Sequence, residues 1–410
     1  MAPLTETEEQ TLIQQVLDQL AGSPYACSAL TKLSGGTANF LYRGTLKEPL
    51  LNGDDSGTVI VKVSTGFVAI NKDFPLDVSR CEFEKSMLSA LDGFPKTIST
   101  SGGHIIVKTP KIFSFNDKTH TQVLQDFAQT ADVTAILESP SVNETLPGSS
   151  PASLGLSVGS WLRMFHNWAA KPAQSALASQ VGANEGMRKL KCLITYDSFI
   201  EILERHPEVI EGTIDTLKEV QATMQNEFNG AQPTEPDGGV HGLIHGDFWG
   251  GNILLPSGPW TESQNPSKPT NLFVIDWENV QFGHRAVDVG GLLADLYERN
   301  HFKSVEASIP VMKGFIEGYG PLSEDLAYRV AVHAGVHLIC WYYRRDRNAP
   351  LPHPLPKVLA ALTIGRDLIV KGWTKDKAWL QTSIIGSIFA DENLLKVEGI
   401  DTKKCSRQTQ

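Results

Sequence analysis

The sequence predicts an α+β fold of two lobes, with a small N-terminal antiparallel sheet lobe followed by a large, mainly helical C-terminal lobe. The chain has 410 residues, more than one ordinary domain requires. β-rich runs with one intervening helical pattern dominate up to about residue 126, and helical periodicity dominates afterwards. These patterns predict an N-terminal sheet lobe over 1–124, a hinge over 125–128, a mainly helical C-terminal lobe over 129–400 and a flexible tail over 401–410.

The N-terminal elements are predicted from apolar spacing and turn residues. Apolar residues at helical spacing predict a helix over residues 5–21, with Thr5 as its N-cap. Strands are predicted on both sides of the glycine turn in KLSGGTANFLYRGTL, and over TVIVKVS, GHIIVKT and TQVLQDF. A helix is predicted over residues 77–91, between the third and fourth of these strands.

The C-terminal elements are predicted mainly as helices. Pro, Gly and Ser predict a loop over residues 146–155. Helical patterns follow in SVGSWLRMFHNWA, SFIEILERH and EVIEGTIDTLKEVQATMQNEF, and again over about 323–345 and from 355 into the 380s.

Composition excludes some classes of function. With 36 basic and 46 acidic residues the net charge is −10. This charge disfavours nucleic acid as a partner and mildly favours cationic small molecules as ligands. The five cysteines are scattered without a CxxC pair, which predicts a reducing compartment. The acidic N-terminus does not read as a leader, and no run approaches the ~20 apolar residues of a membrane span. We therefore expect a cytoplasmic protein without a membrane partner. The sequence carries no signal for the oligomeric state.

Two segments pair an apolar β-type run with a polar cluster. LIHGDFWGGNILL contains Asp247 and Asn252 in an Asp-x4-Asn spacing, and NLFVIDWENVQFG places Asp276 at the end of a strand. Phosphoryl transfer requires a carboxylate that orients and deprotonates the nucleophile, and oxygen ligands for the Mg²⁺ that bridges the phosphates. The order and spacing of these residues therefore point to phosphoryl transfer.

HGDFWGGN resembles the catalytic loop of the aminoglycoside-phosphotransferase and choline-kinase superfamily, which has a protein-kinase-like fold. The Asp-Trp-Glu triplet resembles the DxE variant of methylthioribose kinase and its relatives, and RAVDVGGLLADLYERNHF is most similar to that side of the superfamily, including fungal small-molecule kinases. The resemblance implies that Asp247 is the catalytic base, that Asn252 and Asp276 bind Mg²⁺, and that Glu278 is an additional metal ligand.

The resemblance also assigns residues of the N-terminal lobe to nucleotide binding. It implies that the turn Ser34, Gly35 and Gly36 approaches the phosphates of ATP, and that Lys62 grips the α- and β-phosphates. Glu84, on the following helix, resembles the glutamate that pairs with this lysine. Taken alone, Lys62 also fits a strand-edge lysine that reaches water, and the glycines also fit a simple hairpin turn.

Further positions take their expected roles from the same resemblance. Gln125 and Phe127 would hold adenine at the hinge through backbone groups. Asp288 would brace the catalytic loop from below, and His245 would support the loop backbone. We expect ordinary helical histidines at His166, His333 and His337. The aromatic cluster that begins at Trp341 is expected to serve core and surface packing.

A competing motif lies in the C-terminal half. Gly155-Leu-Ser-Val-Gly159 satisfies GxSxG, the nucleophile elbow of α/β-hydrolases, which needs a buried strand directly before it. A loop is predicted there instead, so Ser157 is expected to cap a helix.

The sequence thus predicts an ATP- and Mg²⁺-dependent kinase that phosphorylates a hydroxyl of a small metabolite. An amino alcohol, an amino sugar, a thioribose-like compound and a hydroxylated secondary metabolite remain open as acceptors, and ATP is not distinguished from GTP. The alternative is a nucleotide-binding pseudokinase or scaffold without transfer activity.

Overall fold

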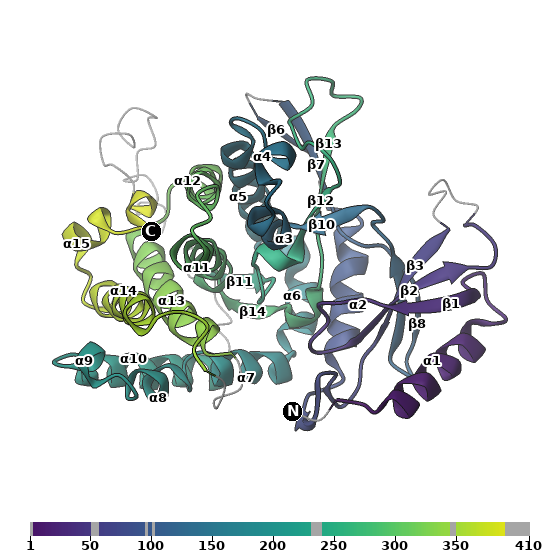
Figure 1. Cartoon of the computed structure of the whole chain (residues 1–410), viewed down its shortest axis with the longest axis horizontal. Coiled ribbons are helices and arrows are strands. Elements are labelled where there is room, and N and C mark those ends of the chain that lie inside the picture. The colour runs from purple at the N-terminus through teal and green to yellow at the C-terminus, as the bar shows by residue number, and fades with distance from the viewer. Residues whose placement is uncertain are drawn as a thin grey trace, which may run out of the picture.

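The computed structural model describes residues 3–50, 57–94, 97–100, 103–230, 240–344 and 350–389. The predicted tail over 401–410 lies outside these residues. A β-rich part that carries α1 and α2 adjoins a larger helical part, and the helices α9, α14 and α15 lie farthest from the N-terminal sheet (Figure 1). The α+β fold predicted from the sequence, with an N-terminal antiparallel sheet followed by mainly helical structure, is confirmed.

The N-terminal sheet is antiparallel, with the order β1-β2-β3-β9-β8. Its strands are β1 (Cys27–Lys32), β2 (Phe40–Leu46), β3 (Thr58–Val63), β8 (Ile112–Asn116) and β9 (Thr121–Gln125). Alternating apolar residues of the sheet pack with the buried residues of α1 (Glu6–Leu20), which begins at the predicted Thr5 cap. A short hairpin of β4 (Phe67–Val68) and β5 (Asn71–Pro75) precedes α2 (Arg80–Leu91). β3 is therefore the central strand, held on both edges.

A second five-stranded sheet combines segments that are far apart in the chain. Its order is β10 (Thr130–Asp132), β12 (Ile253–Pro256), β13 (Thr270–Val274), β7 (Gly103–Lys108) and β6 (Thr97–Thr100). β7 runs parallel to β13, with Ile105 opposite Thr270. The strand predicted in GHIIVKT therefore exists but pairs outside the N-terminal sheet, and it supports the strand that leads to Asp276. A further pair joins β11 (His241–Ile244) to β14 (Gln281–His284).

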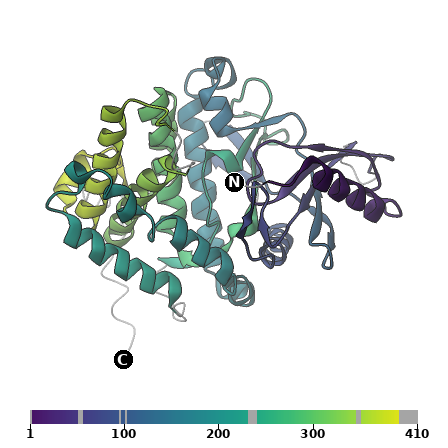
Figure 2. The same ribbon diagram turned by 60° about the horizontal axis from the view of Figure 1, so that its bottom comes forward.

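Helices form the rest of the structure (Figure 2). They are α3 (Val133–Glu138), α4 (Val142–Thr145), α5 (Ser150–Ala169), α6 (Ser175–Gly182), α7 (Glu185–Ile194), α8 (Phe199–Leu203), α9 (Pro207–Ile210), α10 (Ile214–Asn229), α11 (Ala286–Lys303), α12 (Ser308–Tyr319), α13 (Glu324–Tyr342), α14 (Leu355–Trp373) and α15 (Lys377–Thr382). No helix of the described residues is long and apolar enough to cross a membrane.

Two predictions of secondary structure need correction. The helix predicted over EVIEGTIDTLKEVQATMQNEF is broken, because Gly212 has φ +74° and separates α9 from α10. The loop predicted over 146–155 ends early, since α5 begins at Ser150 with a proline in its first turn. Proline is well tolerated there because the first N–H groups of a helix have no partner within it.

The GxSxG motif lies inside α5 and serves helix packing. Ser157 is fully buried in mid-helix, where its hydroxyl donates to the Ser153 carbonyl at 2.8 Å, so the prediction that it caps the helix is wrong. A Cβ on Gly155 would overlap the Val311 carbonyl, and a Cβ on Gly159 would overlap the Phe315 carbonyl. These glycines let α5 and α12 approach backbone to backbone.

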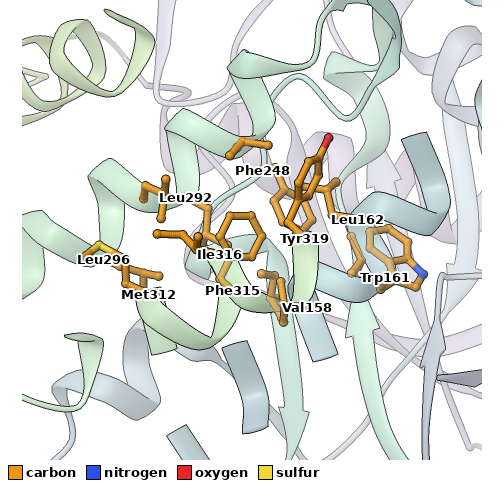
Figure 3. Close-up of a cluster of buried hydrophobic side chains, with 14 of the residues drawn as sticks. Val158, Trp161, Leu162, Phe248, Leu292, Leu296, Met312, Phe315, Ile316 and Tyr319 are labelled. Atoms are coloured by element: carbon orange, nitrogen blue, oxygen red, sulfur yellow. The ribbon is translucent and has the colours of Figure 1, made fainter. Parts of the chain in front are cut away.

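The contact between α5 and α12 is part of the main hydrophobic core. Val158 and Leu162 of α5 and Phe315 of α12 lie in one cluster with Leu292 of α11 and with Phe248 of the loop after β11 (Figure 3). The hydrophobic core against which that loop packs is therefore fixed by close helix packing.

We expect Gly159→Ala to destabilise the protein, because its Cβ meets backbone atoms that cannot move independently of α12. Overpacking of this kind costs about 1–3 kcal/mol. The measurement is the free energy of unfolding in urea. Gly22→Ala is the control, since a Cβ there has nothing within 4 Å. Equal free energies of unfolding for Gly159→Ala and the control would contradict the packing argument.

Candidate active site

Lys62, on the central strand β3, is held by two carboxylates. Its side chain is 4% exposed, and its Nζ lies 2.9 Å from Glu84 Oε2 and 2.6 Å from Asp276 Oδ1. Glu84 comes from α2, and its Oε1 also accepts the backbone N–H of Trp277 at 3.1 Å. The ion pair predicted between Lys62 and Glu84 is therefore present, and the segment after β13 joins it.

The charges of this cluster support one another. Burial alone would lower the pKa of Lys62, but the carboxylates of Asp276, Glu84 and Glu278 raise it well above its ordinary value. Burial alone would raise the pKa of Asp276, but the Lys62 ammonium lowers it. Both groups therefore remain ionised at neutral pH.

Asp276 adopts an unusual backbone conformation. It has φ 65° and ψ 66°, in the left-handed region that non-glycine residues seldom occupy. Such a conformation costs of order 1–3 kcal/mol and persists only where surrounding contacts enforce it. The contact with Lys62 is one of these, and it leaves the Asp276 side chain 35% exposed.

Glu278 links three segments. Its Oε2 accepts the Asn39 side-chain N–H at 2.6 Å and the Arg80 Nε–H at 3.0 Å, and it lies 3.8 Å from Lys62 Nζ. Arg80 also donates to Asn39 Oδ1 at 2.8 Å. The loop before β2, the start of α2 and the segment after β13 are thus joined. Sequence reasoning gave no role to Asn39 or Arg80, because neither stands out within its segment.

Asp247 and Asn252 lie together in the loop between β11 and β12. The side-chain N–H groups of Asn252 donate to the Asp247 carbonyl at 2.9 Å and to Asp247 Oδ2 at 3.3 Å. The backbone carbonyl of Asn252 accepts the backbone N–H of Ile275 at 3.0 Å, and Ile275 directly precedes Asp276. This backbone bond, with the pairing of β12 and β13, brings the Asp247 loop next to the Asp276 segment.

Asp288, at the start of α11, braces this loop as predicted. Its carboxylate accepts the N–H groups of His245 at 2.8 Å and Gly246 at 2.9 Å. His166 Nε2 lies 3.1 Å from the same carboxylate. Burial would raise the pKa of Asp288, but the contact with His166 and the donated N–H groups lower it. His166 is therefore part of the brace, which its place in an amphipathic helix did not reveal.

Two further features fix the backbone of the loop. Gly246 has φ 81°, and a Cβ there would overlap the Asn279 carbonyl, so the position requires glycine. His245 Nε2 donates to the Ile275 carbonyl at 3.0 Å, while its Nδ1 accepts the Asp247 N–H at 3.3 Å. His245 supports the loop backbone, as expected.

The turn and hinge residues occupy opposite ends of the N-terminal sheet's central strands. Ser34, Gly35 and Gly36 lie between β1 and β2, and the φ of 103° at Gly35 accounts for glycine there. Gln125 ends β9, and the Phe127 ring packs on Phe273 with centroids 4.1 Å apart.

Asp126, which lies between Gln125 and Phe127 in the hinge, is held by side-chain hydrogen bonds. Asp126 accepts the Arg43 Nε–H at 2.7 Å and the Thr58 hydroxyl at 2.7 Å. The side chains thus anchor this segment to the sheet, and the adenine contacts expected of Gln125 and Phe127 remain a prediction.

Lys191 is the residue near Asp247 that sequence reasoning missed. It lies on α7 with a side chain 4% exposed, and its Nζ is 3.6 Å from Asp247 Oδ1. Its segment, EGMRKLKCLI, alternates charged and apolar residues and resembles an ordinary surface helix. Only the tertiary structure places this lysine beside the loop.

Comparison with known proteins agrees with this geometry. The profile of the phosphotransferase enzyme family matches residues 203–329. Phosphotransferase FrzJ of Cladobotryum sp is 27% identical over 94% of this chain and 98% of its own length. The 4-hydroxytryptamine kinase of Psilocybe cubensis is 21% identical over 77% of this chain and 80% of its own length.

Solved structures are similar at lower identity. A choline/ethanolamine kinase family protein from Mesorhizobium loti covers 92% of this chain and 97% of its own, with 15% identity and a TM-score of 0.43. The matched family profile includes the loop with Asp247 and the segment with Asp276, and the relatives are named phosphotransferase and kinase. Residues 203–329 thus resemble a domain of the phosphotransferase enzyme family.

Proposed function

We propose that this protein transfers the γ-phosphoryl group of ATP to a hydroxyl of a small metabolite. The observation that carries the proposal is the convergence of two residue pairs from distant parts of the chain. Lys62 contacts Asp276, Asp247 contacts Asn252, and a backbone bond at Ile275 ties the pairs together. One ammonium and three oxygen-bearing side chains are thereby concentrated at the junction of the N-terminal sheet and the helical part.

Asp247 is the proposed catalytic base. Its side chain is 22% exposed, and its backbone is fixed by Asn252 and by the brace under the loop. In the proposed reaction the acceptor oxygen forms a bond to the γ-phosphorus while the bond from phosphorus to the bridging β–γ oxygen breaks. The hydroxyl proton passes to the Asp247 carboxylate, and ADP leaves.

Lys62, Ser34, Gly35 and Gly36 are proposed to bind the phosphates of ATP, with Gln125 and Phe127 at the adenine. The Lys62 ammonium is held in place by Glu84, so it requires little reorganisation to meet a phosphate. The alternative of a strand-edge lysine directed to water does not fit a side chain that is 4% exposed.

Oxygen ligands suitable for Mg²⁺ are present at the site. The described residues contain no group of three or more His, Cys, Asp or Glu that could hold a metal ion. The proposed Mg²⁺ site combines one or two protein carboxylates with an amide and phosphates. Asp276 is partly exposed, and Asn252 uses its N–H groups on Asp247, which leaves its amide oxygen. When bound, Mg²⁺ would neutralise charge on the phosphates. The contacts of Glu278 favour a bracing role over the metal-ligand role predicted for it.

The relatives support transfer to a small molecule. Those matched over most of this chain are named phosphotransferase and kinase, which favours an active kinase over a pseudokinase or scaffold. The 4-hydroxytryptamine kinase of Psilocybe cubensis adds weight to a hydroxylated secondary metabolite as the acceptor. Amino alcohols, amino sugars and thioribose-like compounds belong in the same screen.

We expect Asp247→Asn to lower turnover by about 10²- to 10⁴-fold while MgATP affinity stays close to the wild-type value, because the base acts on the acceptor. Mass spectrometry of a panel of hydroxylated acceptors incubated with MgATP measures the transfer. Asp117→Asn, at an exposed turn, is the control. Wild-type turnover by Asp247→Asn would exclude Asp247 as the base, and no transfer to any acceptor would favour the scaffold alternative.

We expect Asp276→Asn to remove the Mg²⁺-dependent part of ATP binding, since it loses the carboxylate that is proposed to hold the metal. Calorimetric titration with ATP in the presence and in the absence of Mg²⁺ separates the Mg²⁺-dependent part of the ATP affinity from the Mg²⁺-independent part. If Mg²⁺ increases the ATP affinity of the variant as much as that of the wild type, Asp276 does not hold the metal.

A further inference from the structure

Lys191 is a buried cation with an incomplete set of partners. Its side chain is 4% exposed, and within the described residues its ion-pair partner is Asp247, at 3.6 Å from Nζ. That distance is longer than an ordinary hydrogen bond, and an ammonium group has three N–H donors. Burying a cation without full compensation is costly, so this lysine is expected to have a function.

Two carboxylates and one guanidinium are the charged groups with the largest effect on the pKa of Lys191. Burial lowers the pKa of Lys191, while Asp247 and Asp288 oppose that shift and Arg344 adds to it. The pKa values of His333 and His337, on α13, lie well below the ordinary value, because of burial and then of the nearby Lys191. Both imidazoles are therefore neutral at physiological pH, so neither adds positive charge beside Lys191.

Arg344, which follows α13, is a second cation whose charge interacts with Asp247 and Lys191. Its guanidinium lies over the Trp341 ring at 4.0 Å from the centroid, and the His337 ring stacks on Trp341 with centroids 4.5 Å apart. The Asp247 carboxylate favours the charged form of Arg344. The Asp247 carboxylate thus interacts with positive charge from Lys191 of α7 and from Arg344.

The two buried lysines of the site differ in how well they are neutralised. Lys62 has two carboxylates within 3 Å, on the side proposed for the nucleotide. Lys191 has one carboxylate at 3.6 Å, on the side proposed for the acceptor. An anion that arrives next to Asp247 would complete the partners of Lys191, and phosphoryl transfer produces such an anion there.

The geometry points to Lys191 as the residue that binds the transferred phosphoryl group on the acceptor side. This inference rests on the proposed function. The product of the reaction is a phosphate monoester, which carries nearly two negative charges close to the Asp247 carboxylate. Repulsion between them would oppose transfer, and an ammonium within 4 Å offsets it. Lys191 would therefore stabilise the phosphoryl group as it leaves ADP and hold the phosphorylated product.

The test compares two lysines of the same helix. Lys189 is 61% exposed and pairs with Glu185, so Lys189→Met is the matched control for Lys191→Met. Inorganic phosphate serves as the probe, titrated by calorimetry into the protein saturated with MgADP. We expect Lys191→Met to bind phosphate roughly ten- to a hundredfold more weakly than the control, since one charge-assisted hydrogen bond is lost, with MgADP affinity unchanged. Lys191→Arg should restore part of the affinity.

The outcomes separate this inference from the proposed function. Absence of MgADP binding by the wild type would overturn the proposed function itself. If MgADP binds but phosphate binds equally to both methionine variants, or not to the wild type, Lys191 has no such role. A parallel loss of MgADP affinity and melting temperature in Lys191→Met would indicate a structural role instead. If the methionine variant does not fold, Lys191→Gln, which keeps a polar group without the charge, takes its place.

Discussion

The ion pairs of Lys62 hold the site together. The ammonium on β3 meets Glu84 of α2 and Asp276 after β13, so one buried charge joins the N-terminal sheet, its helix and the segment next to the catalytic loop. Because a buried cation that loses its partners is strongly destabilising, these three elements are constrained to keep one relative position. The left-handed backbone of Asp276 is a local cost that this contact offsets.

The Asp247 loop depends on a second set of buried contacts. Asp288 fixes two backbone N–H groups of the loop, and the glycine-mediated packing of α5 on α12 fixes the core beneath it. The Ile275 backbone bond then connects this rigid loop to the Lys62 cluster. The proposed chemistry needs a base, a metal and phosphate-binding groups at defined distances, and these buried contacts join the elements that carry them.

Sequence reasoning predicted the parts of the site that lie in recognisable local patterns. Asp247 and Asn252 share one loop, Asp276 ends an apolar strand, and Lys62 interrupts another, so each could be found from its own segment. Lys191 could not, because its segment resembles a surface helix and only tertiary packing buries it. The parallel pairing of β7 with β13 was missed for the same reason, since strand order is not encoded in local periodicity. Gly155 was placed at the end of a predicted loop because glycine is common in turns, but it also serves close helix packing.

A crystal structure with Mg²⁺ and a nonhydrolysable ATP analogue tests the central claim most directly. The account predicts that Lys62 Nζ contacts phosphate oxygens, that the metal lies between Asp276 and the Asn252 side-chain oxygen, and that the γ-phosphate faces Asp247. A nucleotide bound elsewhere, or a γ-phosphate directed away from Asp247, would contradict it.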